Sequence, residues 1–181
     1  MKPVVVAVSK SGNHTFSKPN LDLIRLIEDF GVQGDAHAGK TVKHRYFVKK
    51  DPIRPNIRQV HLIHQELLDK LGKKGFLVRP GELGENITTR GINLLALSSG
   101  TILKIGQEVL VKITALRSPC QQIDDFQPGL LKEVLYKDQD GKLVRETGVM
   151  GIVLKGGEVR PGDTITIELD PEPYQKLEYI W

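Results

Sequence analysis

The sequence has 181 residues, of which 39% are hydrophobic and 27% are charged. These values are ordinary for a soluble globular protein, and the length suits one substantial core, so we expect a single domain. The single cysteine excludes an intrachain disulfide framework, and the apolar run Val4–Val8 is too short for a secretion signal or a membrane span. We therefore expect a cytoplasmic protein that does not act at a membrane.

The net charge of +4 comes from one stretch of the chain. Between Lys40 and Arg58 the sequence carries seven basic residues and the single acid Asp51, whereas the rest of the chain carries 19 basic and 21 acidic residues. Such a run is either a solvated, mobile loop or a rim that collects an anion, for example a phosphate, a phosphorylated cofactor or nucleic acid.

In the first part of the chain, β-branched residues predict a strand over residues 3–11 that ends in a Ser/Gly/Asn turn. Residues 20–35 fit either a helical face or a bent strand, and the pattern leaves both open. Residues 57–64 alternate as a strand. Residues 64–76 place three leucines on one helical face and two glycines at its end, which predicts a helix.

The second part predicts short strands and turns. Residues 94–118 hold two or three strands with a hairpin around Gly106, and residues 127–144 hold a short helix before a strong turn at 138–141. Residues 148–169 fit a strand, a Gly-Gly turn, an Arg-Pro-Gly-Asp turn and a strand. Many short strands with two modest helices predict a mainly β fold, a barrel or sandwich with helical decorations.

Four of the five histidines lie between His37 and His64, a density that suggests metal ligation. His61 and His64 would share one face of a helix, but their segment reads as a strand, in which they point to opposite faces. No cysteine or histidine motif with zinc spacing accompanies them. We therefore do not expect a zinc site.

Two glycine-containing segments carry candidate polar groups. Residues 32–40 lack the spacing of a P-loop, which argues against nucleotide hydrolysis, but they place Asp35 and His37 two positions apart, able to face the same way in extended backbone. Residues 80–86 permit a tight loop that presents backbone N–H groups and the Asn86 amide, which suit the edge of a heterocycle.

Cys120 is a candidate nucleophile or soft metal ligand. The default interpretation is packing, because a free cysteine behaves as a small hydrophobe. Cys120 follows a proline and opens a loop after a predicted strand, where functional residues concentrate. Arg117 would favour the thiolate, whereas Asp124 and Asp125 would oppose it. These local features leave both interpretations open.

Five segments together resemble the MOSC domain, named after the C-terminal domain of molybdenum cofactor sulfurase. They are GVQGDAHAGK, RQVHLI, PGELGENITTRGINLLALSSGTILKIG, LRSPCQQIDDFQPGLL and GVMGIVLKGGEVRPGDTI, and they follow the order of the family. The resemblance covers about Val4 to Leu169. It implies a β-barrel-like MOSC domain over residues 1–170, followed by a C-terminal tail at 171–181, with Cys120 as the functional centre.

The resemblance also implies an activity. In amidoxime-reducing members of the family, the signature cysteine ligates the molybdenum of a pterin cofactor, and N-hydroxylated substrates are reduced. This chain is therefore expected to bind molybdenum cofactor through Cys120 and to act as a small oxidoreductase on small molecules, with electrons from a separate donor protein. It lacks a desulfurase domain, so its chemistry is expected to be independent of pyridoxal phosphate.

Two other functions stay open. The first is a non-enzymatic cofactor-binding or sulfur-carrier module with a persulfide on Cys120. The second is an RNA- or nucleotide-binding barrel, which only the basic run favours, so nucleic acid is not the partner we expect. Substrate specificity does not carry over from the family, because the insertion at 41–56 is longer than in minimal members.

The resemblance further implies roles for individual residues. Cys120, Asp35 and His37 are the expected catalytic residues, with Asp35 and His37 on the substrate side. The expected cofactor-binding residues are Arg58, His61, Asn86, Lys40 and Arg45. The basic stretch would receive the phosphate of the pterin.

Overall fold

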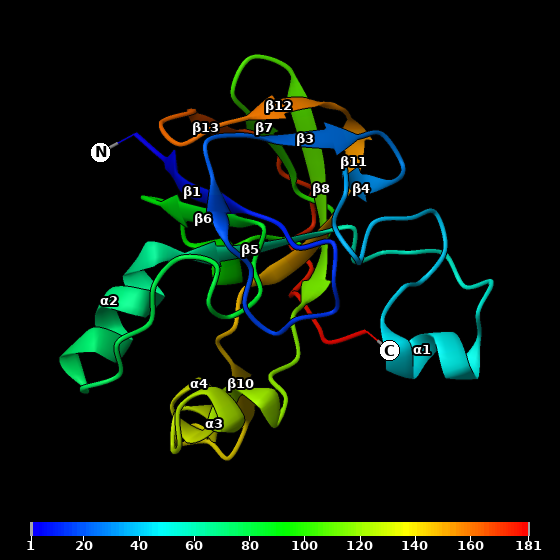
Figure 1. The fold of residues 1–181 in the computed structure, drawn as a ribbon. Coiled ribbons are helices and arrows are strands. Elements are labelled where there is room, and N and C mark those ends of the chain that lie inside the picture. The colour runs from blue at the N-terminus through cyan, green and yellow to red at the C-terminus, as the bar shows by residue number, and fades with distance from the viewer. Residues whose placement is uncertain (1, 181) are drawn as a thin grey trace.

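The computed structural model describes residues 2–180, and its largest element is an eight-stranded mixed sheet with the order β13-β7-β8-β11-β5-β6-β1-β2 (Figure 1). Its strands are β1 (Val4–Ser9), β2 (Asn20–Leu21), β5 (Val60–His64), β6 (Ile87–Arg90), β7 (Ile102–Ile105), β8 (Val109–Leu116), β11 (Val149–Lys155) and β13 (Ile165–Leu169). Neighbouring strands are antiparallel except β5 and β6. The predicted mainly β fold is confirmed.

The sheet curls without closing completely. An isolated bridge joins Val4 to Thr164, and the Val5 N–H donates to the carbonyl of Asp163 at 2.8 Å, so the start of β1 meets the start of β13. No ladder of strand pairs completes the ring, and the sheet is barrel-like only in this approximate sense.

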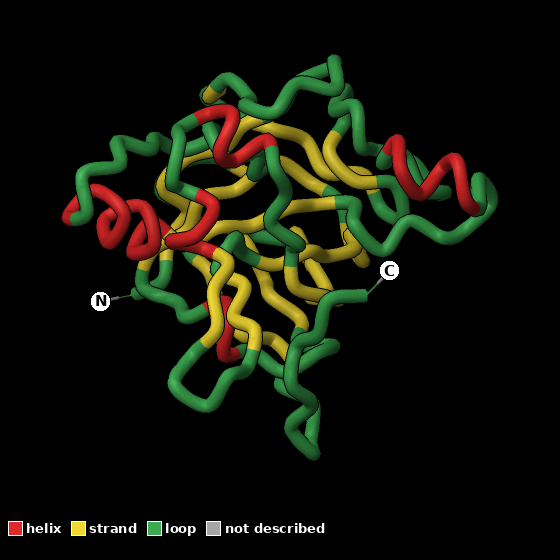
Figure 2. The backbone as a smooth tube through the Cα atoms, turned by 90° about the horizontal axis from the view of Figure 1, so that it is seen from below, coloured by secondary structure: helices red, strands yellow, loops and turns green. Residues whose placement is uncertain are grey.

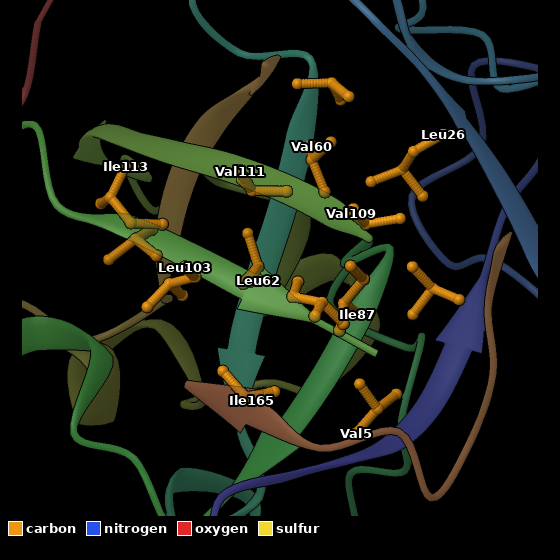
Figure 3. Packing of buried hydrophobic residues seen from close by; sticks show 14 of the residues in the cluster. Val5, Leu26, Val60, Leu62, Ile87, Leu103, Val109, Val111, Ile113 and Ile165 are labelled. Atoms are coloured by element: carbon orange, nitrogen blue, oxygen red, sulfur yellow. The ribbon is translucent and has the colours of Figure 1, made fainter. Parts of the chain in front are cut away.

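The core fills the inside of the curled sheet because its strands alternate between inward apolar and outward residues. In β8, Val109, Val111 and Ile113 are fully buried, and the residues between them are partly or fully exposed. Leu62 of β5 and Ile87 of β6 belong to the same core cluster, although neither strand is next to β8 in the sheet (Figure 3). Burial of this apolar surface is the main stabilising contribution to the fold.

The ambiguous segment 20–35 forms strands. β3 (Ile24–Ile27) and β4 (Gly31–Val32) join β12 (Gly157–Val159) in a small sheet with the order β12-β3-β4. Ile24 and Leu26 are buried while Arg25 and Ile27 are exposed, which is the two-residue period of a strand. β12 begins at Gly157, the second glycine of the expected Gly-Gly turn, and is a strand that the pattern of turns did not predict.

The prediction of two modest helices was incomplete, because the structure has four: α1 (Arg45–Lys50), α2 (Gln65–Lys73), α3 (Gln122–Phe126) and α4 (Leu131–Val134), besides a 3₁₀ turn at Leu94–Ala96. The helix at residues 64–76 is confirmed as α2, and the short helix before the turn at 138–141 is α4. A two-stranded sheet of β9 (Leu135–Lys137) and β10 (Leu143–Arg145) follows. α1 and α3, with six and five residues, lack the closely spaced leucines by which the still shorter α4 was predicted.

α2, α3 and α4 share a second, smaller hydrophobic cluster. In Figure 1, α3 and α4 lie below the main sheet and α2 lies at its left. Leu67, Leu68 and Leu71 of α2 lie in it beside Ile123 and Val134, all 2% exposed or less. This cluster anchors α3, which begins two residues after Cys120. Within residues 2–180, every helix is too short or too polar to cross a membrane.

Residues 41–56, the basic insertion, project from the sheet with α1 at their tip (Figures 1 and 2). A bridge between Thr41 and Pro55 closes the base of the insertion. The Asn56 Nδ2 atom donates to the carbonyls of His37 and Gly39, at 3.0 and 2.9 Å. These bonds tie the base of the insertion to the segment that carries His37.

The C-terminal tail packs on the sheet and ends near α1 (Figure 2). Leu177 is 1% exposed and belongs to the main core, and a bridge joins Lys176 to Ser98. The Leu116 N–H, at the end of β8, donates to the carbonyl of Glu178 at 2.9 Å. The tail therefore forms part of the wall beside the Cys120 loop.

Candidate functional site

A cavity of about 470 Å³ lies where the loop after β8, the start of β5, the insertion and the tail meet. Its lining is rich in cations and, among the described residues, includes no aspartate or glutamate. The cationic side chains are those of Lys18, Lys43, Arg45, Arg58 and Arg117. A concave site with this charge favours an anionic ligand.

Cys120 stands at the cavity wall on the loop between β8 and α3. The loop is held in place because the Arg117 N–H donates to the carbonyl of Gly148 at 3.0 Å, and the Thr147 hydroxyl donates to the carbonyl of Arg117 at 3.0 Å. Cys120 is half-buried and belongs to neither hydrophobic cluster. Its thiol contacts Gln122 Oε1 at 3.6 Å. The cysteine therefore lines the cavity rather than filling the core.

Arg117 is a cavity residue that the sequence analysis noted only as a neighbour of Cys120. Its Nη1 atom is buried and has no hydrogen-bond partner within the described part of the chain. Burial lowers the pKa of Arg117, while the Cys120 sulfur and the Glu85 carboxyl act in the opposite direction. A buried guanidinium nitrogen without an acceptor costs free energy, and a bound anion would supply that acceptor.

Asp35 lies behind the cavity and not on its surface, since its side chain is 2% exposed and ion-paired with Lys18, Nζ to Oδ2, at 2.8 Å. Burial alone would raise the pKa of Asp35, but the hydrogen bond from His37 and the charge of Lys18 outweigh it and hold that pKa well below its usual range. Asp35 is therefore a buried carboxylate, and the catalytic role expected for it stays a prediction.

Asn86 joins this carboxylate to β5. Its Nδ2 atom donates to Asp35 Oδ2 at 3.0 Å and to the carbonyl of Ser9 at 3.1 Å, and its Oδ1 atom accepts from the His61 N–H at 3.1 Å. Both amide hydrogens are taken inside the fold, although Asn86 lines the cavity. The direct contact with a cofactor that we expect of Asn86 stays a prediction.

His61 also lines the cavity, at 5% exposure. Its Nε2 atom lies 2.7 Å from the carbonyl of Thr147 and donates to it, because a carbonyl oxygen can only accept. Burial and the charge of Arg117 lower the pKa of His61 to about 3, so the ring is neutral. The strand predicted here is confirmed as β5. Residues 2–180 contain no group of three metal-ligating side chains of the histidine, cysteine or carboxylate type.

Arg58 connects the insertion to the tail. Its guanidinium lies over the Phe47 ring of α1 at 5.1 Å and over the Tyr179 ring at 5.2 Å, and it donates to the carbonyl of Ile180. Arg45, at the start of α1, reaches the same cavity, whereas Lys40 is exposed and lies outside its lining.

The structure thus brings six of the eight predicted site residues to one cavity: Cys120, His37, Arg58, His61, Asn86 and Arg45. Sequence reasoning missed further lining residues, among them His14, Lys18, His44 and Tyr179. They come from segments far apart in the chain, and only His44 lies in the stretch that is dense in histidine and basic residues.

These features define a small, mainly β domain with one cationic cavity that carries a thiol. The profile of the MOSC domain family matches residues 34–166, and the chain belongs to this family.

Solved structures with the same fold share little sequence with this chain. The YuaD protein from Bacillus subtilis is 22% identical with a TM-score of 0.73, and the match covers 91% of this chain and 94% of YuaD. YiiM from Geobacillus stearothermophilus is 18% identical with a TM-score of 0.65, covering 97% of this chain and 79% of YiiM. YiiM from Escherichia coli is 17% identical with a TM-score of 0.63, and the match covers 97% of this chain and 73% of that protein. At these identities the likeness shows the fold alone.

A curated relative from Gibberella moniliformis, described as a reductase, is 32% identical over 95 residues. The match covers 51% of this chain and 16% of that much longer protein.

Proposed function

We propose that this protein binds molybdenum cofactor in the cavity beside Cys120 and reduces the N–O bond of small N-hydroxylated molecules. The observation that carries the proposal is the pairing of a half-buried thiol with the unpartnered Nη1 atom of Arg117 in a cavity lined by cations. A soft thiolate is the side chain that suits a molybdenum centre, and cations suit the phosphate of the pterin.

The donor set fits such a group. The cavity volume of about 470 Å³ lies in the range of small-molecule sites, roughly 300–1,000 Å³. Cys120 would hold the metal, and the cofactor, when bound, would supply the two-electron redox centre. Arg117 would satisfy its buried Nη1 atom on an anionic oxygen, and Arg58 would add a second charged donor.

The remaining residues shape this site. His61 stays neutral at physiological pH and holds β5 against Thr147. Asp35 fixes His37, whose backbone N–H donates to Asp35 Oδ1 at 2.9 Å, and we assign His37 to the substrate side. Lys40, Arg45 and Asn86 complete the proposed cofactor-binding set.

Electrons would come from a separate donor protein, and a free thiol suits the reducing cytoplasm, where we expect the protein to act. The relative described as a reductase agrees with redox chemistry, though over only part of this chain.

A sulfur-carrier function is the second candidate. Burial lowers the pKa of Arg117, and the nearby Cys120 sulfur opposes that effect, so the guanidinium lies close enough to stabilise a persulfide anion on that sulfur. In that case Cys120 would deliver sulfur and hold no metal.

One comparison separates the two functions. Wild-type protein and Cys120→Ser are purified from a host that makes molybdenum cofactor, and both are analysed for molybdenum, released pterin and intact mass, with Arg160→Lys at the surface as the control. We expect molybdenum and pterin in wild type and in the control, and their loss in Cys120→Ser. A metal-free wild type whose thiol has gained the mass of one sulfur atom would establish the carrier function instead. Equal molybdenum in wild type and Cys120→Ser would overturn Cys120 as the ligand.

A further inference from the structure

Three histidines from three separate segments gather on one side of the cavity. His14 follows β1, His37 follows β4, and His44 immediately precedes α1. The ring centroids of His14 and His37 are 5.1 Å apart, and those of His37 and His44 are 6.4 Å apart. All three line the cavity that Cys120 lines. His14 and His44 each line the cavity with part of their surface and expose the rest to solvent, and His37 is half-buried, so the cluster runs from solvent to the cavity.

The cluster is electrostatically coupled. Burial and the charge of His37 lower the pKa of His14, and the same two causes, in the same order, lower the pKa of His44 to about 4. A proton on the central ring therefore disfavours a proton on either neighbour.

The surrounding charges also lower the pKa of His14 and His44, with one exception. Lys18 and Arg45 face His14, and Arg58 and Arg117 face His44, all of them cations that lower the pKa of the histidine they face. The exception is the Asp35 carboxylate, which acts on His14 in the opposite sense and lies 3.4 Å from His37 Nδ1.

A neutral imidazole carries one N–H donor and one acceptor nitrogen, so it can take a proton on one side and release one on the other. His61, the remaining histidine of the cavity, cannot do this, because it is buried and its Nε2–H is bonded to the carbonyl of Thr147. Since no carboxylate of the described residues lines the cavity, His14, His37 and His44 are its best-placed proton carriers.

We propose that His14, His37 and His44 form a proton relay from solvent to the substrate in this cavity. The inference rests on the proposed function, since reduction of an N-hydroxylated compound consumes protons: R–NH–OH, two electrons and two protons give R–NH₂ and H₂O. The N–O bond breaks, one proton goes to the nitrogen and one to the departing oxygen. The electrons come from the separate donor protein, a flavin or iron–sulfur carrier by class. A proton donated to the departing oxygen lets it leave as water instead of hydroxide, which is general acid catalysis.

The test uses His14→Gln, His37→Gln, His44→Gln and the double variant His14→Gln/His44→Gln, with His64→Gln as the control histidine outside the cavity. Cofactor-loaded proteins reduce an N-hydroxylated purine with reduced methyl viologen, which supplies one electron per molecule. We expect His37→Gln and the double variant to lose about a hundredfold in kcat, the scale of a lost general acid. The molybdenum content of every variant should equal that of wild type, and the rate of His64→Gln should be unchanged.

A second measurement does not depend on activity. In cofactor-free protein, the imidazole C–H resonances of His14 and His44 are followed by NMR between pH 3 and 9. In His37→Gln the pKa of both residues should rise, because the repelling charge is gone.

The outcomes are separable. If loaded wild type reduces no N-hydroxylated compound, the proposed function fails and the relay fails with it. If wild type turns over and the three single variants and the double variant match it, only the relay is overturned. An unchanged titration of His14 and His44 in His37→Gln would also overturn the relay, because the rings would then not be coupled.

Discussion

Lys18, which lines the cavity, forms a buried ion pair with Asp35 behind it, Nζ to Oδ2 at 2.8 Å. Their side chains are 4% and 2% exposed. The pair joins the loop after β1 to the loop after β4, the two segments that carry His14 and His37. Its integrity therefore governs both the stability of the fold and the shape of the site.

Removing the lysine should be costly. Lys18→Met leaves the Asp35 carboxylate buried without its charge partner, which we expect to lower the free energy of unfolding by about 3–5 kcal/mol. Urea unfolding of wild type and variant measures the difference. The control is Arg160→Met, which breaks the exposed pair with Glu158 and should cost about 1 kcal/mol at most. A loss for Lys18→Met no larger than that of the control would contradict a structural role for the pair.

The acid sensitivity of the protein should have a histidine component. The pKa of His61 falls from 6.5 to about 3 on folding, because burial disfavours the charged ring. Below pH 6.5 the unfolded chain binds a proton at His61 that the native chain does not bind. Stability is therefore complete above pH 6.5 and is lost as pH falls toward about 3, by about 1.4 kcal/mol per pH unit.

Urea unfolding at pH 7 and pH 5 measures this slope before most carboxylates titrate. His61→Gln should be less stable at pH 7. Its free energy of unfolding should also fall less steeply with decreasing pH, by about 1.4 kcal/mol per pH unit, since glutamine binds no proton. An identical slope in His61→Gln would show that His61 is not the origin of the effect.

The tail should owe part of its anchoring to Tyr179. Its ring lies below two guanidinium groups, Arg58 at 5.2 Å and Arg145 at 5.4 Å. Tyr179→Ala removes both contacts, each worth about 0.5–1 kcal/mol at a partly exposed site, so we expect a loss of about 1–2 kcal/mol and easier proteolysis after residue 170. Tyr174→Ala, 57% exposed and outside this cavity, is the matched control and should leave both properties close to wild type. Equal proteolysis of the two variants would argue against anchoring of the tail by the contacts of Tyr179 with Arg58 and Arg145.

Gly148 should be intolerant of any side chain. Its φ is +85°, and an added Cβ would collide with the carbonyl oxygen of Leu62 on β5. Gly148→Ala would also disturb the carbonyl that accepts from the Arg117 N–H and so the loop that carries Cys120. We expect a loss of more than about 2 kcal/mol, as the left-handed backbone alone costs about 1–2.

Gly141 is the matched control for this substitution, since its φ is +75° but nothing lies within 4 Å of the added atom. Gly141→Ala should be destabilised only by the left-handed backbone conformation. The thermal unfolding temperatures of the two variants are compared: Gly141→Ala carries the backbone strain alone, and Gly148→Ala carries the same strain plus the collision with Leu62. A Gly148→Ala protein as stable as Gly141→Ala would show that β5 can move aside.

Much of the fold could be predicted from local sequence because its elements carry the period of their own structure. β8 alternates Val109, Val111 and Ile113 with outward residues, and α2 repeats leucine at helical spacing. The short helices α1 and α3 were missed because they lack the closely spaced leucines that indicated α4, and β12 lies between two predicted turns. Residues 20–35 stayed ambiguous because β3 and β4 are stabilised by pairing with each other and with the distant β12, a contact that no local pattern records.

The candidate site divides in the same way. The sequence by itself determined that the only thiol, Cys120, opens a loop after a strand, that the positive charge lies between Lys40 and Arg58, and that the MOSC segments occur in order. Only the tertiary structure decided that Asp35 is withdrawn behind the cavity by Lys18, that Lys40 lies outside it, and that His14 and His44 lie inside it. The physical reason is that burial, charge pairing and hydrogen bonding depend on distances between segments dozens of residues apart. The curling of the sheet fixes these distances, and no local spacing encodes them.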